Sequence, residues 1–212
     1  MSELLFNELP RPTFRWLRVN HTVSSLAGED TAVQSIAVEA NKNILSPLPV
    51  GTALLDGNYE GANKEAVHVL VEKAEGYAIN VPPKAKEVVG IRIDANARVA
   101  NRFQFIVGEG AELEVQFYVT GSGDALTNVS YLNEYDVKEA GKVVVKKVNL
   151  LPEHVQHIEH RYTKLEEKAD VEYINIEIGG SENILNYYHD LVGQESRMVH
   201  DIAYLGNKEQ KF

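Results

Sequence analysis

A rhythm of about 28 residues constrains the fold of this 212-residue chain more than any other feature. Its clearest copy is Val107–Val115 (VGEGAELEV), in which a short acidic turn ends at a small residue and strict alternation of apolar and polar residues follows. One weaker earlier copy and three later ones place a small residue at the same point. The five small residues, spaced by 26, 30, 28 and 27 positions, are Ala85, Ala111, Gly141, Ala169 and Ser196.

Each copy has the form strand, short polar turn, strand and looser return. A fixed period of 20 to 50 residues is typical of stacked repeats, because two or three short strands cannot bury their apolar face alone. The period therefore predicts a mainly β fold, a β-solenoid with one rung per repeat and the small residue at a tight corner. An antiparallel meander or sandwich, in which the same turns close hairpins, is the alternative.

The alternation also predicts which face of each strand is buried. After Ala111, four apolar residues share one face, and glutamates occupy the solvated face. The apolar residues are Leu113, Val115, Phe117 and Val119, and the glutamates are Glu112 and Glu114. After Ala169 the apolar phase shifts to Ile174, Ile176 and Ile178, which predicts a bulge.

The first residues differ from the rest, so the predicted division is an N-terminal segment, 1–43, and a β-helix core, 44–212. Leu9–Asn20 (LPRPTFRWLRVN) is predicted to be extended, because proline disfavours helical geometry in the residue before it. A short mixed helix and loop region follows. Within the core, Gly57–Lys73 is interpreted as a turn leading into an apolar strand around Val67–Val71.

Composition excludes several classes of function. The net charge of −10 argues against binding to duplex nucleic acid, which needs Lys and Arg, and against adsorption to anionic membranes. The chain has no cysteine, which excludes disulfides, thiolate nucleophiles and cysteine-ligated clusters on this chain alone. The N-terminus lacks the apolar core of a secretory signal and no run could span a membrane, so a cytoplasmic location is predicted.

Three stretches resemble the SufB/SufD family of iron–sulfur cluster assembly proteins, SufD-like members more than SufB-like ones. Leu9–Asn20 is similar to the family's proline–aromatic–arginine segment. Asn101–Asp124 is similar to its core strand pair, and Ile178–Phe212 to its glycine-pair region followed by a strand, a turn and a glycine near a Lys/Gln pair. The resemblance is collinear over most of the chain and implies a right-handed parallel β-helix.

The resemblance also implies partners. Family members pair through their β-helices, and each binds SufC, an ABC-type ATPase, so this chain is expected to be a non-catalytic scaffold with a SufB-like and a SufC-like partner. An iron–sulfur cluster is expected only in complex with a partner. The family's cluster-associated residues and ATPase-docking segment lie beyond the position matching Phe212, so this sequence is expected to be either incomplete or a shortened member.

Histidines are the most conspicuous candidates for a site. His154, His157 and His160 lie within seven residues and could bind Zn, Ni or Fe, but on a strand His157 faces opposite to the other two. The favoured interpretation is a polar face with its histidines in solvent, and no metal site is assigned. His189 and His200 each precede an aspartate, but adjacent strand residues point to opposite faces, so neither forms a base with an orienting carboxylate.

No catalytic or cofactor-binding residue is assigned. Thr120–Leu126 (TGSGDAL) lacks the ending of a phosphate-binding loop and is interpreted as an inter-rung loop. The alternatives to a SUF scaffold are a self-associating β-solenoid, in which one copy caps another, and a polysaccharide-active β-helix enzyme. A row of Lys and Arg along one stack of strands would favour the enzyme.

Overall fold

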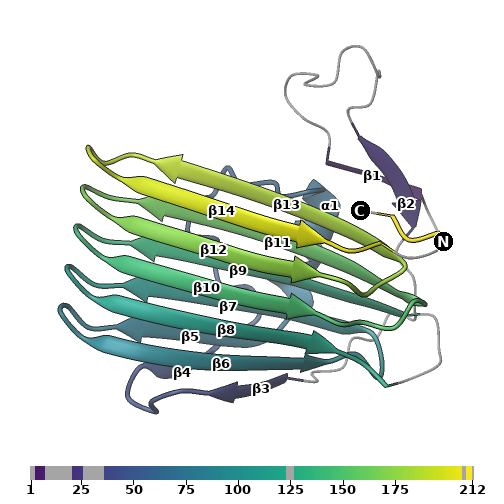
Figure 1. Ribbon diagram of the computed structural model, residues 1–212, viewed down its shortest axis with the longest axis horizontal. Coiled ribbons are helices and arrows are strands. Elements are labelled where there is room, and N and C mark those ends of the chain that lie inside the picture. The colour runs from purple at the N-terminus through teal and green to yellow at the C-terminus, as the bar shows by residue number, and fades with distance from the viewer. Residues whose placement is uncertain (1–2, 8–20, 26–35, 123–126, 207–208, 212) are drawn as a thin grey trace.

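The computed structural model describes residues 3–7, 21–25, 36–122, 127–206 and 209–211, so the predicted extended segment Leu9–Asn20 lies outside the described residues. Two long sheets face each other (Figure 1). Sheet 1 contains, in spatial order, β4 (Leu45–Leu48), β5 (Gly76–Val81), β7 (Val99–Val107), β9 (Thr127–Val137), β11 (Val155–Leu165) and β13 (Glu182–Leu191). Sheet 2 contains β3 (Ile36–Glu39), β6 (Lys86–Asp94), β8 (Glu112–Thr120), β10 (Lys142–Asn149), β12 (Asp170–Glu177) and β14 (Arg197–Tyr204).

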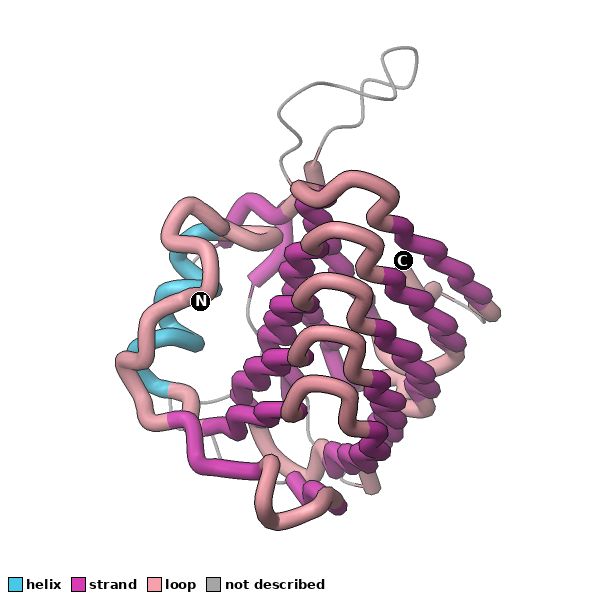
Figure 2. The backbone as a smooth tube through the Cα atoms, turned by 90° about the vertical axis from the view of Figure 1, so that its left-hand side faces the viewer, coloured by secondary structure: helices cyan, strands magenta, loops and turns pink. Residues whose placement is uncertain are grey.

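Three further elements lie outside the two long sheets. The strands β1 (Glu3–Phe6) and β2 (Thr22–Ser25) form an antiparallel pair of their own. The helix α1 (Lys64–Lys73) lies beside sheet 1, on its outer side (Figures 1 and 2).

The strand pairing confirms the β-solenoid. From β5 onward the chain alternates between the sheets, and every successive pair within a sheet is parallel. The register follows the repeat: Val145 lies beside Val115 on one side and Tyr173 on the other. The antiparallel alternative is therefore wrong for the repeats, although β3 and β4 join the first rung antiparallel.

The five corners stack directly above one another (Figure 2). The side chains of Ala111 and Ala169 are fully buried there, and a Cβ on Gly141 would lie 2.9 Å from Val137 Cγ1. This confirms why the position needs a small residue. The residue before each small one has a positive φ of 54° to 62°; these residues are Lys84, Gly110, Ala140, Lys168 and Glu195.

The predicted bulge after Ala169 is wrong. β12 pairs without a break, residue for residue, with both of its neighbours. The apolar phase shifts because polar side chains, those of Asn175 and Glu177, take the inward positions and are 1% and 0% exposed. Ile174 and Ile176 then necessarily point outward.

The predicted strand around Val67–Val71 is also wrong, since these residues belong to α1. The Asn63 side chain caps the helix by accepting a hydrogen bond from the Ala66 amide at 2.9 Å, which satisfies an otherwise free donor. Val67 and Leu70 are buried in a cluster with Leu132 and Tyr162 of sheet 1. The helix and the loop before it thus cover the outer face of sheet 1.

Candidate functional site

The space between the two sheets changes from apolar to charged toward the last rungs. In the first rungs it is filled by aromatic and aliphatic side chains, with Phe105 and Tyr135 stacked at 4.5 Å. One inward stack across sheet 2 then runs Ile91, Phe117, Lys147, Asn175, and the next runs Ile93, Val119, Asn149, Glu177. From β10 onward, these two inward positions of sheet 2, which hold apolar residues in earlier rungs, are therefore occupied by polar residues.

Glu159 is the centre of this interior cluster. Its carboxylate accepts hydrogen bonds from Lys147 Nζ at 2.5 Å and from the Arg161 guanidinium at 2.5 and 3.0 Å. Asn133 and the Tyr187 hydroxyl donate to it at 3.1 Å each. Lys147 also forms an ion pair with Glu177. The four charged side chains, two of each sign, are all 0% exposed.

The charges in this cluster hold one another ionised. Burial alone would raise the pKa of Glu159, but the nearby Arg161 and Lys147 outweigh it and hold that pKa well below its usual range. Glu159 in turn keeps the pKa of Arg161 above its ordinary value, despite burial. The Arg161 guanidinium also lies 4.2 Å and 4.1 Å from the ring centroids of Tyr173 and Tyr187, a cation–π arrangement.

His157 belongs to the same cluster and is neutral at physiological pH. Its Nε2 lies 2.9 Å from the Tyr131 hydroxyl, and its Nδ1 lies 3.0 Å from Asn183 Oδ1. Burial, reinforced by the charge of Lys147, lowers its pKa to about 4.

His189 and His200 lie at the open end of the interior, in the last rung. Their ring centroids are 6.0 Å apart, and both rings contact Tyr173. Burial and the charge of Arg161 lower the pKa of each to about 4. Neither forms an ion pair with the aspartate that follows it among the described contacts. Two imidazoles are fewer than the three protein ligands typical of a catalytic zinc site.

The structure separates the three histidines of the EHVQHIEH stretch. His157 points between the sheets, whereas His160 points to the outer face of sheet 1, as alternation predicts. His154 lies in the turn before β11. The prediction that these histidines lie in solvent is wrong for two of them, since His157 and His160 are 0% exposed. Within the described residues, no group of three or more acidic or histidine side chains is placed to hold a metal.

His160 anchors the loop that leads into α1. Its Nδ1 accepts a hydrogen bond from the Ala62 amide at 3.0 Å, and burial lowers its pKa to about 4. The loop passes so close that a Cβ on Gly61 would lie 2.5 Å from His160 Nδ1 and 2.5 Å from Val67 Cγ2.

Gly61→Ala is therefore expected to destabilise the protein by about 2–4 kcal/mol, from left-handed backbone strain plus overpacking. Gly110→Ala is the matched control: its φ of 61° equals the 62° of Gly61 within a degree, but its nearest neighbour, Lys84 Cγ, is 3.7 Å away. It should cost about 1 kcal/mol or less, from the backbone alone. Urea unfolding measures both, and equal losses would contradict the close packing at His160.

A second buried ion pair, which no sequence pattern had indicated, holds an earlier part of the same loop. Arg102 Nη2 lies 3.0 Å from Glu134 Oε2, with side chains 0% and 1% exposed on the outer face of sheet 1. Arg102 also donates to the Thr52 carbonyl at 2.7 Å, and Glu134 accepts from the Leu55 amide at 2.7 Å. The pair thus attaches residues 52–55 to the solenoid.

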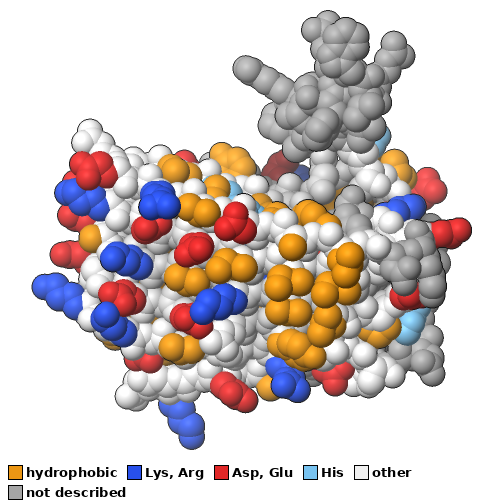
Figure 3. All heavy atoms as spheres, viewed as in Figure 1, with side chains coloured by type: hydrophobic (Ala, Val, Ile, Leu, Met, Phe, Trp, Pro, Cys, Tyr) orange, Lys and Arg blue, Asp and Glu red, His pale blue; other side chains and the backbone are white. Residues whose placement is uncertain are grey.

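The exposed face of sheet 2 carries charges and one apolar patch (Figure 3). The outward row nearest the corners alternates in sign: Lys86, Glu112, Lys142, Asp170, Arg197. It is not the row of Lys and Arg that would favour an enzyme acting on acidic sugars. At the carboxyl ends of the strands the exposed apolar residues are Tyr118, Leu150, Ile176, Ile178 and Leu205.

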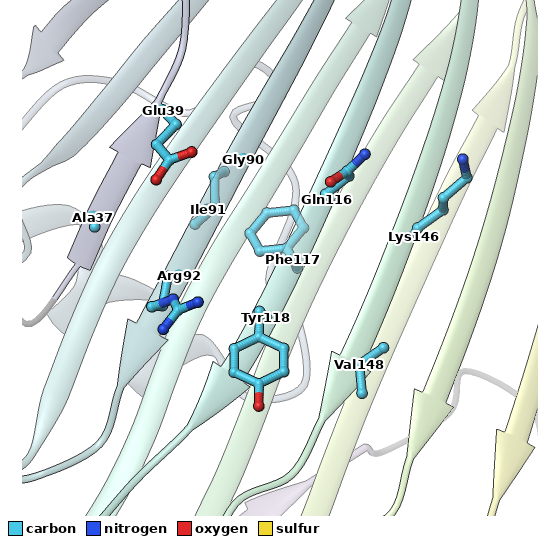
Figure 4. A pocket seen from close by; sticks show the side chains of 10 residues that line it. All are labelled: Ala37, Glu39, Gly90, Ile91, Arg92, Gln116, Phe117, Tyr118, Lys146 and Val148. Atoms are coloured by element: carbon cyan, nitrogen blue, oxygen red, sulfur yellow. The ribbon is translucent and has the colours of Figure 1, made fainter.

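A shallow groove adjoins this patch where Gly90 leaves a gap in the outward side chains (Figure 4). Its volume is 370 Å³, and it is open to solvent. Arg92 lies 5.2 Å from the Tyr118 ring centroid along its edge, and Lys146 is paired with Glu114 at 3.0 Å.

Within the described residues, these features define a parallel β-solenoid with a buried, charge-balanced cluster between its sheets and free strand edges at its last rung. Residues 91–212 match the family model for SUF system FeS cluster assembly, SufBD core domain. The match covers more than half of the chain, so the protein belongs to this family of iron–sulfur cluster assembly components. No curated protein and no solved structure matches the chain. Within the part of the chain that the structure describes, no helix could cross a membrane.

Proposed function

We propose that the protein is a non-catalytic scaffold subunit of the SUF system, pairing with a SufB-like subunit and a SufC-like ATPase. An iron–sulfur cluster would be held only in complex with a partner, because the chain has no cysteine and the charged interior is closed to solvent. The subunit would work in the cytoplasm with that assembly.

The last rung carries this proposal. Among the described residues, β13 and β14 have a neighbouring strand on one side only, apart from a single bridge between Glu182 and Lys211. Unpaired strand edges readily pair with another chain. Apolar side chains around this rung are 46% to 65% exposed; these are Leu191, Val192, Tyr204 and Leu205.

Co-purification with tagged SufB-like and SufC-like proteins from the same source tests the proposal. The wild-type chain should co-elute with the SufB-like subunit, and Val192→Asp with Leu205→Asp should weaken that binding by about tenfold or more. Val88→Asp is the matched control, because Val88 is 58% exposed but lies on the first rung. Equal binding by all three proteins, or binding by none, would contradict pairing through the last rung.

Self-association is the second candidate, and the same uncapped rung supports it. A second copy offers the same free edges, and two copies can pair about a twofold axis. Light scattering on the chain alone distinguishes the candidates: a dimer that the Asp variants dissociate favours self-association, whereas a monomer that binds the SufB-like protein favours the SUF partner.

A further inference from the structure

The first described residues of the chain lie against its last two rungs. The Asn7 side-chain amide donates to the Leu185 carbonyl on β13 at 3.4 Å. Ser24, on β2, bonds to Glu182 at the start of β13, and Gln156 Nε2 donates to Ser24 Oγ at 2.7 Å. The β1–β2 hairpin therefore crosses the outer face of β11 and β13, beside the uncapped end (Figure 1).

One aromatic side chain anchors the hairpin. Phe6 is 0% exposed and packs in a cradle formed by Ala62 and Ala66 from the α1 region and by Ile158 and Ile184 from the solenoid. Its neighbour on β1, Leu5, is 37% exposed. Burying one Phe is worth about 2–3 kcal/mol.

Apart from Phe6, hydrogen bonds rather than strand pairing attach the hairpin to the rest of the described chain; they include Asn63 Nδ2 to the Leu5 carbonyl and the Asn7 amide to the Ala62 carbonyl, each at 2.7 Å. β1 and β2 have four residues each and pair only with each other, and a two-stranded hairpin is marginally stable by itself. By contrast, β11 pairs with ten residues of β13 and eleven of β9. Elements with few buried contacts open locally at a lower free energy than the core does.

We propose that the β1–β2 hairpin is a releasable strap over the last two rungs. When it closes, it covers Ile158 and Ile184 and holds the start of β13 through Ser24, Gln156 and Glu182. When it opens, it uncovers this apolar cradle and loosens the terminal rung while the lower rungs stay folded. The order of the last rung therefore depends on whether the N-terminal hairpin is closed.

Native-state hydrogen exchange on the full chain tests the strap. In the wild type, amides of β1 and β2 should exchange at least about tenfold faster than those of β7 and β9. Phe6→Ala should speed exchange in the hairpin and at the start of β13 by a further tenfold or so, with β7 and β9 unchanged. Leu5→Ala is the matched control and should leave all four regions as in the wild type.

A variant with the hairpin covalently tied to β11 tests whether fast exchange in the hairpin requires its release from the solenoid. Because the chain has no cysteine, Ser24→Cys with Gln156→Cys introduces a single pair of thiols that a short bis-alkylating reagent can join. Joining them should slow exchange in the hairpin to the rate of the core strands. The proposal is overturned if the wild-type hairpin exchanges as slowly as β9, or if Phe6→Ala speeds all rungs equally. Either result would leave the partner binding through the last rung to be judged by its own test.

Discussion

Replacing Glu159 by glutamine is expected to destabilise the solenoid by about 3–5 kcal/mol, the largest effect of any single substitution considered for this protein. Lys147 and Arg161 would each lose a buried carboxylate partner, leaving two buried cations with Glu177 as their one remaining carboxylate in the cluster, a net charge of +1. Breaking a buried pair costs this much because the remaining ion keeps its desolvation penalty without its counterion. Chemical unfolding followed by circular dichroism measures the loss.

A matched control and a rescue make this expectation specific. Glu112→Gln removes the same charge from an exposed pair with Lys86 and should leave the unfolding midpoint unchanged. Adding Lys147→Met to Glu159→Gln removes the stranded ammonium, so the double variant should be more stable than Glu159→Gln alone. Two outcomes would contradict this expectation: equal losses of stability in Glu159→Gln and Glu112→Gln, or a double variant that is less stable than Glu159→Gln alone. Either would mean that charge balance does not stabilise the cluster.

The fold could be predicted because its cause is periodic in the sequence. Ala111, Gly141 and Ala169 lie at fully packed corners, where the two alanines are 0% exposed and a Cβ on Gly141 would lie 2.9 Å from atoms of its own turn, so their spacing is the rung length. Parallel pairing repeats the same environment in every rung, and a single copy such as Val107–Val115 therefore informs all the others.

The helix could not be predicted in the same way because its apolar run is short. Val67–Val71 contains enough β-branched residues to suit a strand, and short apolar runs are ambiguous by periodicity alone. The deciding signal was local: Asn63 as an N-cap with Glu65 in the first turn and Lys73 in the last. The helix is stable because Val67 and Leu70 pack on sheet 1, a contact that only the tertiary structure supplies.

The charged interior was missed although its signal was present. Extending the alternation from Val143 and Val145 places Lys147 inward, and the same step from Val171 and Tyr173 places Glu177 inward. Polar residues in the inward phase suggested a bulge, because a lone buried charge is unfavourable. The partners that make burial acceptable come from other strands and rungs, and one strand read alone does not reveal them.

Stability is expected to fall as the pH is lowered from about 6.5 toward 4, because His157 and His160 are buried in their neutral form. Both have a folded-state pKa of about 4 against an ordinary value of 6.5, so the unfolded chain binds protons first. The stabilisation is complete above pH 6.5 and is lost as the pH approaches the folded-state pKa. At pH 5 each histidine should have cost roughly 2 kcal/mol relative to pH 7.

The measurement is the unfolding free energy at pH 7, 6 and 5, with the imidazole protons of the folded state followed by NMR. His157→Gln should make the pH dependence shallower, since it removes one of the buried histidines whose pKa is lowered, and His68→Gln, at an exposed site on α1, is the control. Glu159 acts in a separate window at lower pH, because its pKa lies below that of an ordinary carboxyl. A flat profile between pH 7 and 5, or imidazole signals titrating near 6.5 in the folded protein, would mean that water reaches both rings. Water at His157 would mean that the charged cluster between the sheets is not closed to solvent, which removes one reason for expecting an iron–sulfur cluster only at an interface with a partner.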